Sequence, residues 1–500
     1  MTPHPFDNPG SRPSRRYAGP ASALISALLL AACAQQPRLD APVTTELLPA
    51  HWPALQTQAA TEGQESVSQL AWERFFLDPT LRELIQASLN HNRDLRIALL
   101  RVDEARAAYQ IQNADRLPLI GLSGNFARAR VPGDLNPSGR ALTSGDHELA
   151  VGLSSWELDL WGRVKSLSDA ALSNYLAYEA NQQAVQAALI KQVALTYLAL
   201  RSLDERITLT AQTVASREES LRIFTRRTEV GAISRYALTQ VQTLVHQAKT
   251  IDTQLRQQRD VQAHALQQLT GRDVSSGFTQ AVPASIVLPN LPEGLPSDLL
   301  TQRPDIMAAE FALQASHANV AAARAAFLPR IALTGSFGTA SAELDGLFKS
   351  GSRSWQFMPS ISLPLFDGGQ RQANLDLQAV RQNMAVAQYE QSIESALRDV
   401  LDALSNRAVL YEQVQILAAQ REALKERSHL AQMRYDHGAS PYLDVLDAER
   451  DLLSAEQQLV QSRESLLSAQ VSLYAALGGG TQLLSLASTR TSSAASATQP

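Results

Sequence analysis

The side chains best suited to chemistry lie in one short run, LDVLDAER, at positions 443–450. Asp444 and Asp447 are three residues apart, so a helix would place both carboxylates on one face, and Arg450 would continue that face. Such a face can form ion pairs, attract cations or line a pore. Acidic residues in a first helical turn are also stabilised by the helix dipole, by about 0.3–1 kcal/mol each, and this is the purely structural explanation.

Cys33 is the second residue that could carry chemistry, and it is the only cysteine of the chain. It follows several arginines and the apolar run 21–32, and LAAC at 30–33 fits the cleavage site of a secretory signal. The pattern resembles a bacterial lipobox. That resemblance implies a signal peptide over 1–32, an N-acyl diacylglycerol on Cys33 and, with Ala34 next, sorting to the outer membrane. An ordinary signal peptide with an incidental cysteine is the alternative.

The sequence shows no motif of an enzyme, a cofactor site or a metal site. It has no Gly-rich phosphate loop with its lysine, no H-E-x-x-H spacing among its nine histidines and no G-x-S-x-G turn. A net charge of −5 argues against binding of nucleic acid, and no apolar run reaches the roughly 18 residues of a spanning helix. We therefore expect no enzymatic activity, no separate cofactor and no nucleic-acid partner.

The elements that position these residues come from an internal duplication. Pro118, Gly124 and Phe126 recur 211 residues later as Pro329, Gly335 and Phe337. Four further residues recur 207 residues later, and these are Gly162, Arg227, Gly231 and Gly271. The difference predicts four extra residues in the first copy between Phe126 and about Trp156. Two large copies, rather than an array of short repeats, are therefore expected.

The duplication divides the chain. We expect a first repeat over 76–290 and a second over 291–480, preceded by a lipidated extension at 33–75 and followed by a disordered tail at 481–500. At the shift of 207, Asp444 and Asp447 correspond to Ala237 and Gln240. Because the first copy lacks the acidic pair, we favour a functional role for it over dipole compensation alone.

Long helices dominate both copies. Apolar residues recur every seven positions, as in Leu200, Ile207, Val214 and Leu221, and again in Val445, Leu452, Leu459, Leu466 and Leu473. Repeats of this length are typical of coiled-coil packing. Gly231 and Gly438 interrupt these helices and are predicted to be the tips of helical hairpins.

Each copy also contains two short segments with the imperfect alternation of strands. They lie at about 119–129 and 147–158, and at about 330–341 and 354–365. Their length is close to the roughly 9–11 residues that a tilted strand needs to cross a bilayer, although a soluble hairpin would look similar. The predicted fold is thus mainly α-helical with a small β part.

Several motifs together resemble the TolC/OprM-like outer-membrane efflux factors, over about residues 70–480. They are WERFFLDPTL at 72–81, NRDL at 92–95, WELDLWGR at 156–163, LPLFDGG at 363–369 and YDHG at 435–438. The resemblance implies a homotrimer in which each protomer supplies four strands to one twelve-stranded outer-membrane barrel. It also implies a long α-helical coiled-coil tunnel that continues into the periplasm.

The same resemblance assigns a periplasmic gate. Leu443, Asp444, Asp447 and Arg450 match residues that line or close the periplasmic mouth, and Tyr435 matches a tyrosine of the tip network. Some members have an arginine two residues after the tip glycine, where this chain has Ser440, so part of that closing network differs here.

The implied function is that of a passive exit duct for drugs or other small toxic compounds in a tripartite efflux system of the resistance-nodulation-division (RND) type. Its partners would be a periplasmic membrane-fusion adaptor, an inner-membrane RND pump and outer-membrane lipids. A conduit for type I protein secretion is the first alternative. A periplasmic adaptor or coiled-coil scaffold is the second, and the duplicated strand pairs disfavour it.

Overall fold

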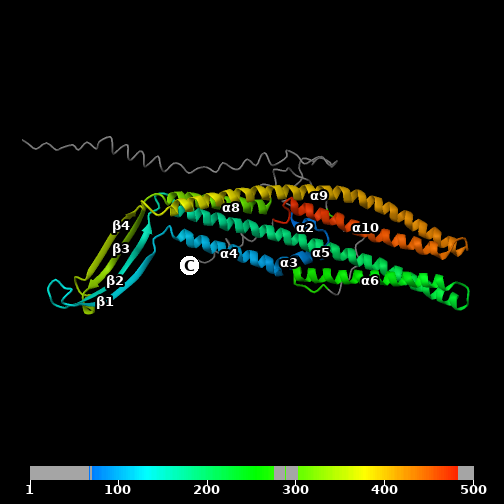
Figure 1. Ribbon diagram of the computed structural model, residues 1–500, viewed down its shortest axis with the longest axis horizontal. Coiled ribbons are helices and arrows are strands. Elements are labelled where there is room, and N and C mark those ends of the chain that lie inside the picture. The colour runs from blue at the N-terminus through cyan, green and yellow to red at the C-terminus, as the bar shows by residue number, and fades with distance from the viewer. Residues whose placement is uncertain (1–66, 68–69, 275–287, 289–301, 482–500) are drawn as a thin grey trace, which may run out of the picture. The chain divides into compact units, whose positions relative to one another are not determined.

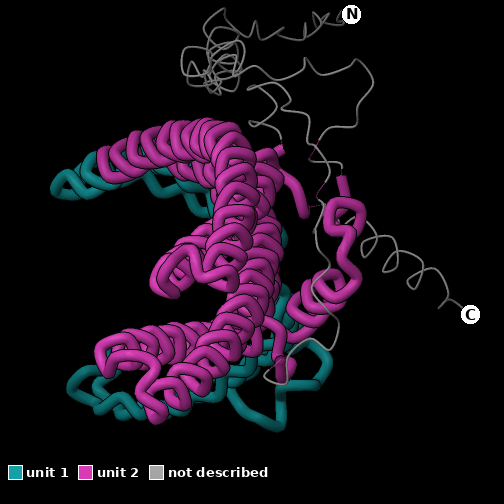
Figure 2. Tube along the Cα trace, turned by 90° about the vertical axis from the view of Figure 1, so that its right-hand side faces the viewer, with its two compact units in different colours: residues 1–42, 116–166, 320–375 teal, residues 43–115, 167–319, 376–500 magenta. Residues whose placement is uncertain are grey.

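The structure is a computed structural model that describes residues 67, 70–274, 288 and 302–481. The predicted signal peptide, Cys33 and nearly all of the extension and tail lie outside these residues. The chain forms two compact units, coloured separately in Figure 2. Among the described residues, unit 1 contains 116–166 and 320–375, and unit 2 contains the rest.

Unit 1 is built on one antiparallel sheet. Its strands are β1 (Ile120–Val131), β2 (Leu142–Glu157), β3 (Arg330–Ser341) and β4 (Arg353–Ser362). They lie in the order β1-β2-β3-β4, so each copy of the repeat supplies one hairpin and the central β2–β3 pairing joins the copies (Figure 1). A short 3₁₀ turn (Leu344–Gly346) lies between β3 and β4. β1 and β4 are left as the two edges of the sheet.

The strand boundaries differ from the sequence expectations at two places. β2 begins at Leu142, five residues before 147, because the hairpin register pairs Leu142 with Val131 and keeps pairing through the polar residues between. β4 ends at Ser362, just before Pro364, which has no N–H to donate to a ladder. One extra residue of β2 is absorbed by a bulge between Leu153 and Trp156.

Unit 2 is helical. Its elements are α2 (Trp72–Phe75), α3 (Pro79–His91), α4 (Arg93–Ala114), α5 (Arg163–Glu229), α6 (Arg235–Thr270), α8 (Pro304–Ala325), α9 (Gln370–Asp436) and α10 (Tyr442–Ala476). α5 and α9 have 67 residues each, and a few residues at one end of α5, α8 and α9 belong to unit 1. The predicted fold class, mainly helical with a four-stranded antiparallel sheet, is confirmed.

Side-chain caps fix where the first helices begin. Asp78 accepts a hydrogen bond from the backbone N–H of Thr80 (2.8 Å) at the start of α3, and Asn92 accepts one from Asp94 (2.9 Å) at the start of α4. Asp78 also accepts a hydrogen bond from the hydroxyl of Tyr197 at 2.6 Å, which ties the beginning of α3 to α5.

The core of unit 2 is aromatic at its centre. The ring of Phe75 stacks on that of Tyr474 with centroids 4.1 Å apart, and Phe76 meets both edge-on. The Tyr474 hydroxyl donates to the carbonyl of Leu70 at 2.7 Å, so its polar atom is satisfied inside the core. Of the heptad columns of α10, Leu473 and Tyr474 belong to this core, whereas Leu446 packs in a second cluster with Phe224 and Val241. Val445, Leu446, Leu453, Leu459, Val460, Leu473 and Tyr474 are all buried.

Candidate functional site

The first hairpin turns at Gly231, between α5 and α6. Gly231 has φ of +70°, a left-handed conformation that glycine adopts without steric cost. The N–H of Ala232 then reaches back to the carbonyl of Arg227 at 2.8 Å and closes the end of α5. Ser234 starts α6 by accepting a hydrogen bond from the N–H of Ala237 at 3.3 Å. The turn is therefore tightly specified.

The second hairpin repeats this geometry 207 residues later. Gly438 also has φ of +70°, and the N–H of Ala439 reaches the carbonyl of Arg434 at 2.8 Å. The start of α10 differs, because Pro441 precedes its first residue and supplies no side-chain cap. Asp444 lies in the first turn of α10. The first turn of α10 therefore has an acidic residue, Asp444, but no side-chain cap like the one that Ser234 gives to α6.

The two hairpins contact each other through an aromatic cluster. The rings of Tyr435 and Tyr442 lie 4.8 Å apart, and those of Phe224 and Tyr442 lie 4.7 Å apart. The guanidinium of Arg227 donates to the Tyr435 hydroxyl at 2.7 Å, and the hydroxyls of Ser220 and Tyr442 share a short hydrogen bond. Burial raises the pKa of Tyr442, so its hydroxyl stays protonated. These contacts join α5 of one copy to α9 and α10 of the other.

Four of the predicted gate residues lie in the first turns of α10, and the fifth, Tyr435, lies near the end of α9. Leu443 is 42% exposed, and Asp444 is exposed as well. Arg450 pairs with Asp447 at 3.1 Å and with Asp451 at 3.1 Å. In the described part of the chain no side-chain partner of Asp444 is found, so Arg450 is held by Asp447 and Asp451 within this protomer.

Sequence reasoning missed Arg227 and Tyr442 as contact residues. The shift of 207 pairs Arg227 with Arg434, each four residues before a tip glycine, and this symmetry was the available signal. It also missed Glu449, a half-buried carboxylate of the same run. Burial raises the pKa of the Glu449 carboxyl, and the charge of Arg217 partly opposes that rise.

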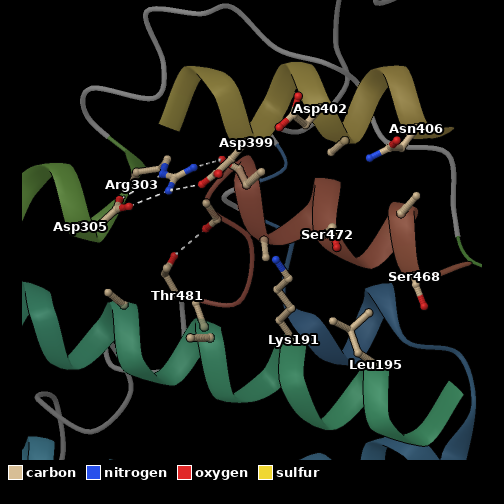
Figure 3. A pocket seen from close by; sticks show the side chains of 18 of the residues that line it. Lys191, Leu195, Arg303, Asp305, Asp399, Asp402, Asn406, Ser468, Ser472 and Thr481 are labelled. Carbon is tan, nitrogen blue, oxygen red and sulfur yellow. Dashed lines mark hydrogen bonds and ion pairs between the residues drawn. The ribbon is translucent and has the colours of Figure 1, made fainter. Parts of the chain in front are cut away.

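A second polar site lies where α10 ends. A cavity of about 640 Å³ is lined by residues of α5, α8, α9 and α10 (Figure 3). Arg303 lies at one end of the cavity. It makes a paired contact to Asp305 (2.6 and 3.0 Å), a contact to Asp399 (3.2 Å) and a hydrogen bond to the carbonyl of Ala476 (3.2 Å). Burial disfavours the charge of Arg303, but these carboxylates outweigh it and raise its pKa. The network anchors the end of α10 to the start of α8.

The described residues bring together no group of three His, Cys, Asp or Glu side chains that could hold a metal ion. In the same part of the chain, no helix is both long enough and apolar enough to cross a membrane.

Comparison with known proteins gives consistent matches. The profile of the family described as "Outer membrane efflux protein" matches residues 84–272 and again 295–479. The two matches start 211 residues apart and end 207 residues apart, which are the shifts of the internal duplication. The duplication is therefore confirmed.

Curated relatives match over nearly their whole length. Outer membrane protein OprJ of Pseudomonas aeruginosa is 40% identical over 471 residues, which is 93% of this chain and 97% of that protein. The toluene efflux pump outer membrane protein TtgI of Pseudomonas putida is 40% identical over 460 residues, or 91% and 97% of the two chains.

Solved structures agree. A membrane protein from Pseudomonas aeruginosa superposes with a TM-score of 0.79 at 40% identity, covering 87% of this chain and 97% of its own. The open state of the MtrE outer membrane channel of Neisseria gonorrhoeae superposes with a TM-score of 0.75 at 36% identity. The match covers 87% of this chain and 98% of the MtrE chain.

Proposed function

This chain belongs to the outer membrane efflux protein family, and we propose that it acts there as a passive trimeric duct through which small toxic compounds leave the cell. The family and the named relatives establish an outer membrane efflux channel. The proposal adds the trimer, the adaptor-operated gate, the RND pump and the lipid anchor.

The open sheet carries the proposal of a trimer. β1 and β4 are edge strands, and in lipid their unpaired N–H and C=O groups would cost several kcal/mol each. Three copies of a four-stranded sheet joined edge to edge would form a closed barrel of twelve strands with no edge left. Large apolar side chains are exposed along the strands, among them Phe126, Trp355, Phe357 and Ile361, as a lipid-facing wall requires.

Two further observations support the passive role. The sequence has no nucleotide-binding or catalytic motif, so we assign the energy for export to a separate inner-membrane pump of the RND type. Relatives of this chain are named as a solvent efflux pump protein and a toluene efflux pump protein, which supports apolar small molecules as the exported class.

We place the gate at the hairpin tips. Three-fold symmetry would collect three copies of Asp444 and Asp447, six carboxylates in all, around one throat, with Leu443 beside them. A ring of carboxylates attracts cations and narrows the range of solutes that pass. The Arg450–Asp447 pair and the Arg227–Tyr435 hydrogen bond would hold the tip closed until a periplasmic adaptor repacks the hairpins.

The function is tested by deleting the gene and measuring the growth of the deletion strain on a panel of solvents and antibiotics. Sensitivity that the intact gene restores supports the proposal, and unchanged tolerance to every compound contradicts the assigned cargo. The trimer is tested separately, by the mass of the detergent-solubilised protein. A monomer would overturn the shared barrel while leaving family membership intact.

A further inference from the structure

A groove of about 720 Å³ lies between α5, α6 and α10, within unit 2. Arg217 lines it from α5, Thr243 and His246 from one face of α6, and Arg450 and Gln457 from α10. Among the described residues that line the groove there are two guanidinium groups, one imidazole and several hydroxyl and amide groups, but no carboxylate. The polar lining of the groove therefore favours the binding of an anion over that of a cation.

Arg217 is the most informative of these residues. It is only 3% exposed, and it donates one hydrogen bond, from Nη1 to the carbonyl of Leu244 at 2.9 Å. Its Nε is buried and has no hydrogen-bond partner in the described structure. Glu449 acts on Arg217 through space, but within that same structure no carboxylate forms an ion pair with it. A buried cation with an unused donor is costly unless something binds it.

We propose that this groove binds a small oxyanion, of the phosphate or carboxylate class, with Arg217 as its principal ligand. The planar guanidinium offers several N–H donors in a fork that matches two oxygens of such a group. Arg450 and His246 lie on the other two helices and add donors to the same volume. The apolar side chains of Ile251 and Leu453 complete the lining and suit the carbon skeleton of an organic acid.

Arg206 shows that an unpartnered Nε is not by itself a site. It lies on the same helix, its Nε is also buried without a hydrogen-bond partner in the described structure, and burial lowers its pKa as it does for Arg217. Arg206 does not line the groove, and Arg217 does. The combination of a buried donor with a polar cavity distinguishes Arg217, and Arg206 supplies the matched control.

The bound oxyanion would join the two copies of the repeat. α5 and α6 form the first hairpin and α10 belongs to the second, so a group held by both Arg217 and Arg450 bridges them. Arg450 also pairs with Asp447, so the ligand would compete with that carboxylate for one guanidinium. This inference does not depend on the proposed export function.

The test is isothermal titration of the full-length protein in detergent with sodium phosphate and, separately, with sodium citrate. Sodium chloride at equal ionic strength is the reference. We expect saturable binding of at least one oxyanion, weakened tenfold or more by Arg217→Gln and unchanged by Arg206→Gln. Binding of only phosphate or only citrate supports the site and assigns its class.

A second variant covers the case in which Arg217→Gln fails to fold, which circular dichroism would reveal. Thr250 is an exposed residue of α6 that lines the groove, so Thr250→Glu adds a negative charge without disturbing the core. We expect it to weaken binding tenfold or more. Three results would overturn the inference. They are no saturable binding of either anion, equal binding by wild type and a folded Arg217→Gln, and undiminished binding by Thr250→Glu.

Discussion

Arg227 and Tyr435 are 208 residues apart in the chain, yet the guanidinium Nη1 of one lies 2.7 Å from the phenol oxygen of the other. The first belongs to the hairpin of the first repeat and the second to the hairpin of the second repeat. This hydrogen bond is therefore a direct link between the two moving parts of the proposed gate, and it can be removed without touching the core.

Removing the Arg227–Tyr435 hydrogen bond should destabilise the closed state of the proposed gate. Tyr435→Phe deletes the acceptor and Arg227→Ala deletes the donor, and a single hydrogen bond of this kind contributes about 0.5–1.5 kcal/mol. We expect either variant to raise the conductance of the trimer in a planar bilayer. The double variant should conduct no more than the more open single variant, because both changes remove one interaction.

Arg222→Ala is the matched control for this pair. Arg222 is exposed on the same helix, and its ion-pair partner among the described residues is Glu219, three residues earlier. Its loss should therefore leave conductance unchanged. Wild-type conductance in both Arg227→Ala and Tyr435→Phe would show that this hydrogen bond does not hold the tip.

The acidic pair should control both conductance and cation block. Replacing Asp444 and Asp447 together by alanine removes six carboxylates from the proposed throat. It also removes one of the two ion-pair partners of Arg450, and Asp451 remains as the other. We expect higher conductance and weaker block by multivalent cations, measured on single channels. If neither quantity changes, the gate does not lie at these residues.

Features that depend on neighbouring residues can be predicted from this sequence, whereas features that depend on residues distant in the chain cannot. Gly231 and Gly438 are local signals, since a helix can end in a left-handed turn there regardless of its surroundings, and both have φ of +70°. The heptad columns likewise predict the side of a helix that packs. Val445 and Leu459 are buried, and Leu452 and Leu466 of the same column are half-buried. The start of β2 at Leu142 could not be predicted, because it depends on pairing with Val131 across the hairpin.

The contacts of the candidate site were the hardest to foresee. Asp447 and Arg450 are three residues apart, so their ion pair follows from helix geometry alone. Arg217 and Glu449 come from different repeats. Arg217 lies in no motif, and nothing in the run 443–450 marks Glu449 as a carboxylate that becomes half-buried. Their burial results from how α5 packs on α10, where Gln457 donates to Thr210 at 3.0 Å, and no local pattern encodes that packing.

The aromatic core of unit 2 should be sensitive to truncation. Phe75 is fully buried against Tyr474, so Phe75→Ala should destabilise the protein by about 3–5 kcal/mol, through lost burial and the cavity left behind. Tyr474→Phe keeps the ring and loses only the hydrogen bond to Leu70, so we expect it to lower the free energy of unfolding by about 1 kcal/mol. Thermal unfolding followed by circular dichroism gives both values, and a Phe75→Ala protein as stable as Tyr474→Phe would contradict the packing.

Cys33 lies outside the described residues, and its lipidation remains a sequence prediction. Cells fed labelled palmitate should incorporate it into the wild-type protein, and Cys33→Ser should abolish incorporation, since no other cysteine is present. A single acyl chain binds membranes only marginally, so the several chains of an N-acyl diacylglycerol are needed for a durable anchor. Labelling of Cys33→Ser would disprove the anchor.

Glu449 should make the tip less stable as the pH rises. Burial raises the pKa of its carboxyl above the ordinary value of 4.5, and the charge of Arg217 on α5 only partly offsets this. The folded protein thus binds this proton more tightly than the unfolded chain does. The resulting stability is fully present below about pH 4.5 and is lost as the pH rises through the raised pKa.

Glu449→Gln removes this titration, because the amide stays neutral. We expect the variant to match wild type in melting temperature at about pH 4 and to exceed it at neutral pH. Glu456, whose pKa burial also raises, contributes the same trend to both proteins, so their difference isolates Glu449. Glu426→Gln, at an exposed position of α9, controls for the change in net charge. A difference that stays constant across this range, or one that favours wild type at neutral pH, would show that Glu449 is not held in a desolvated site between the two hairpins.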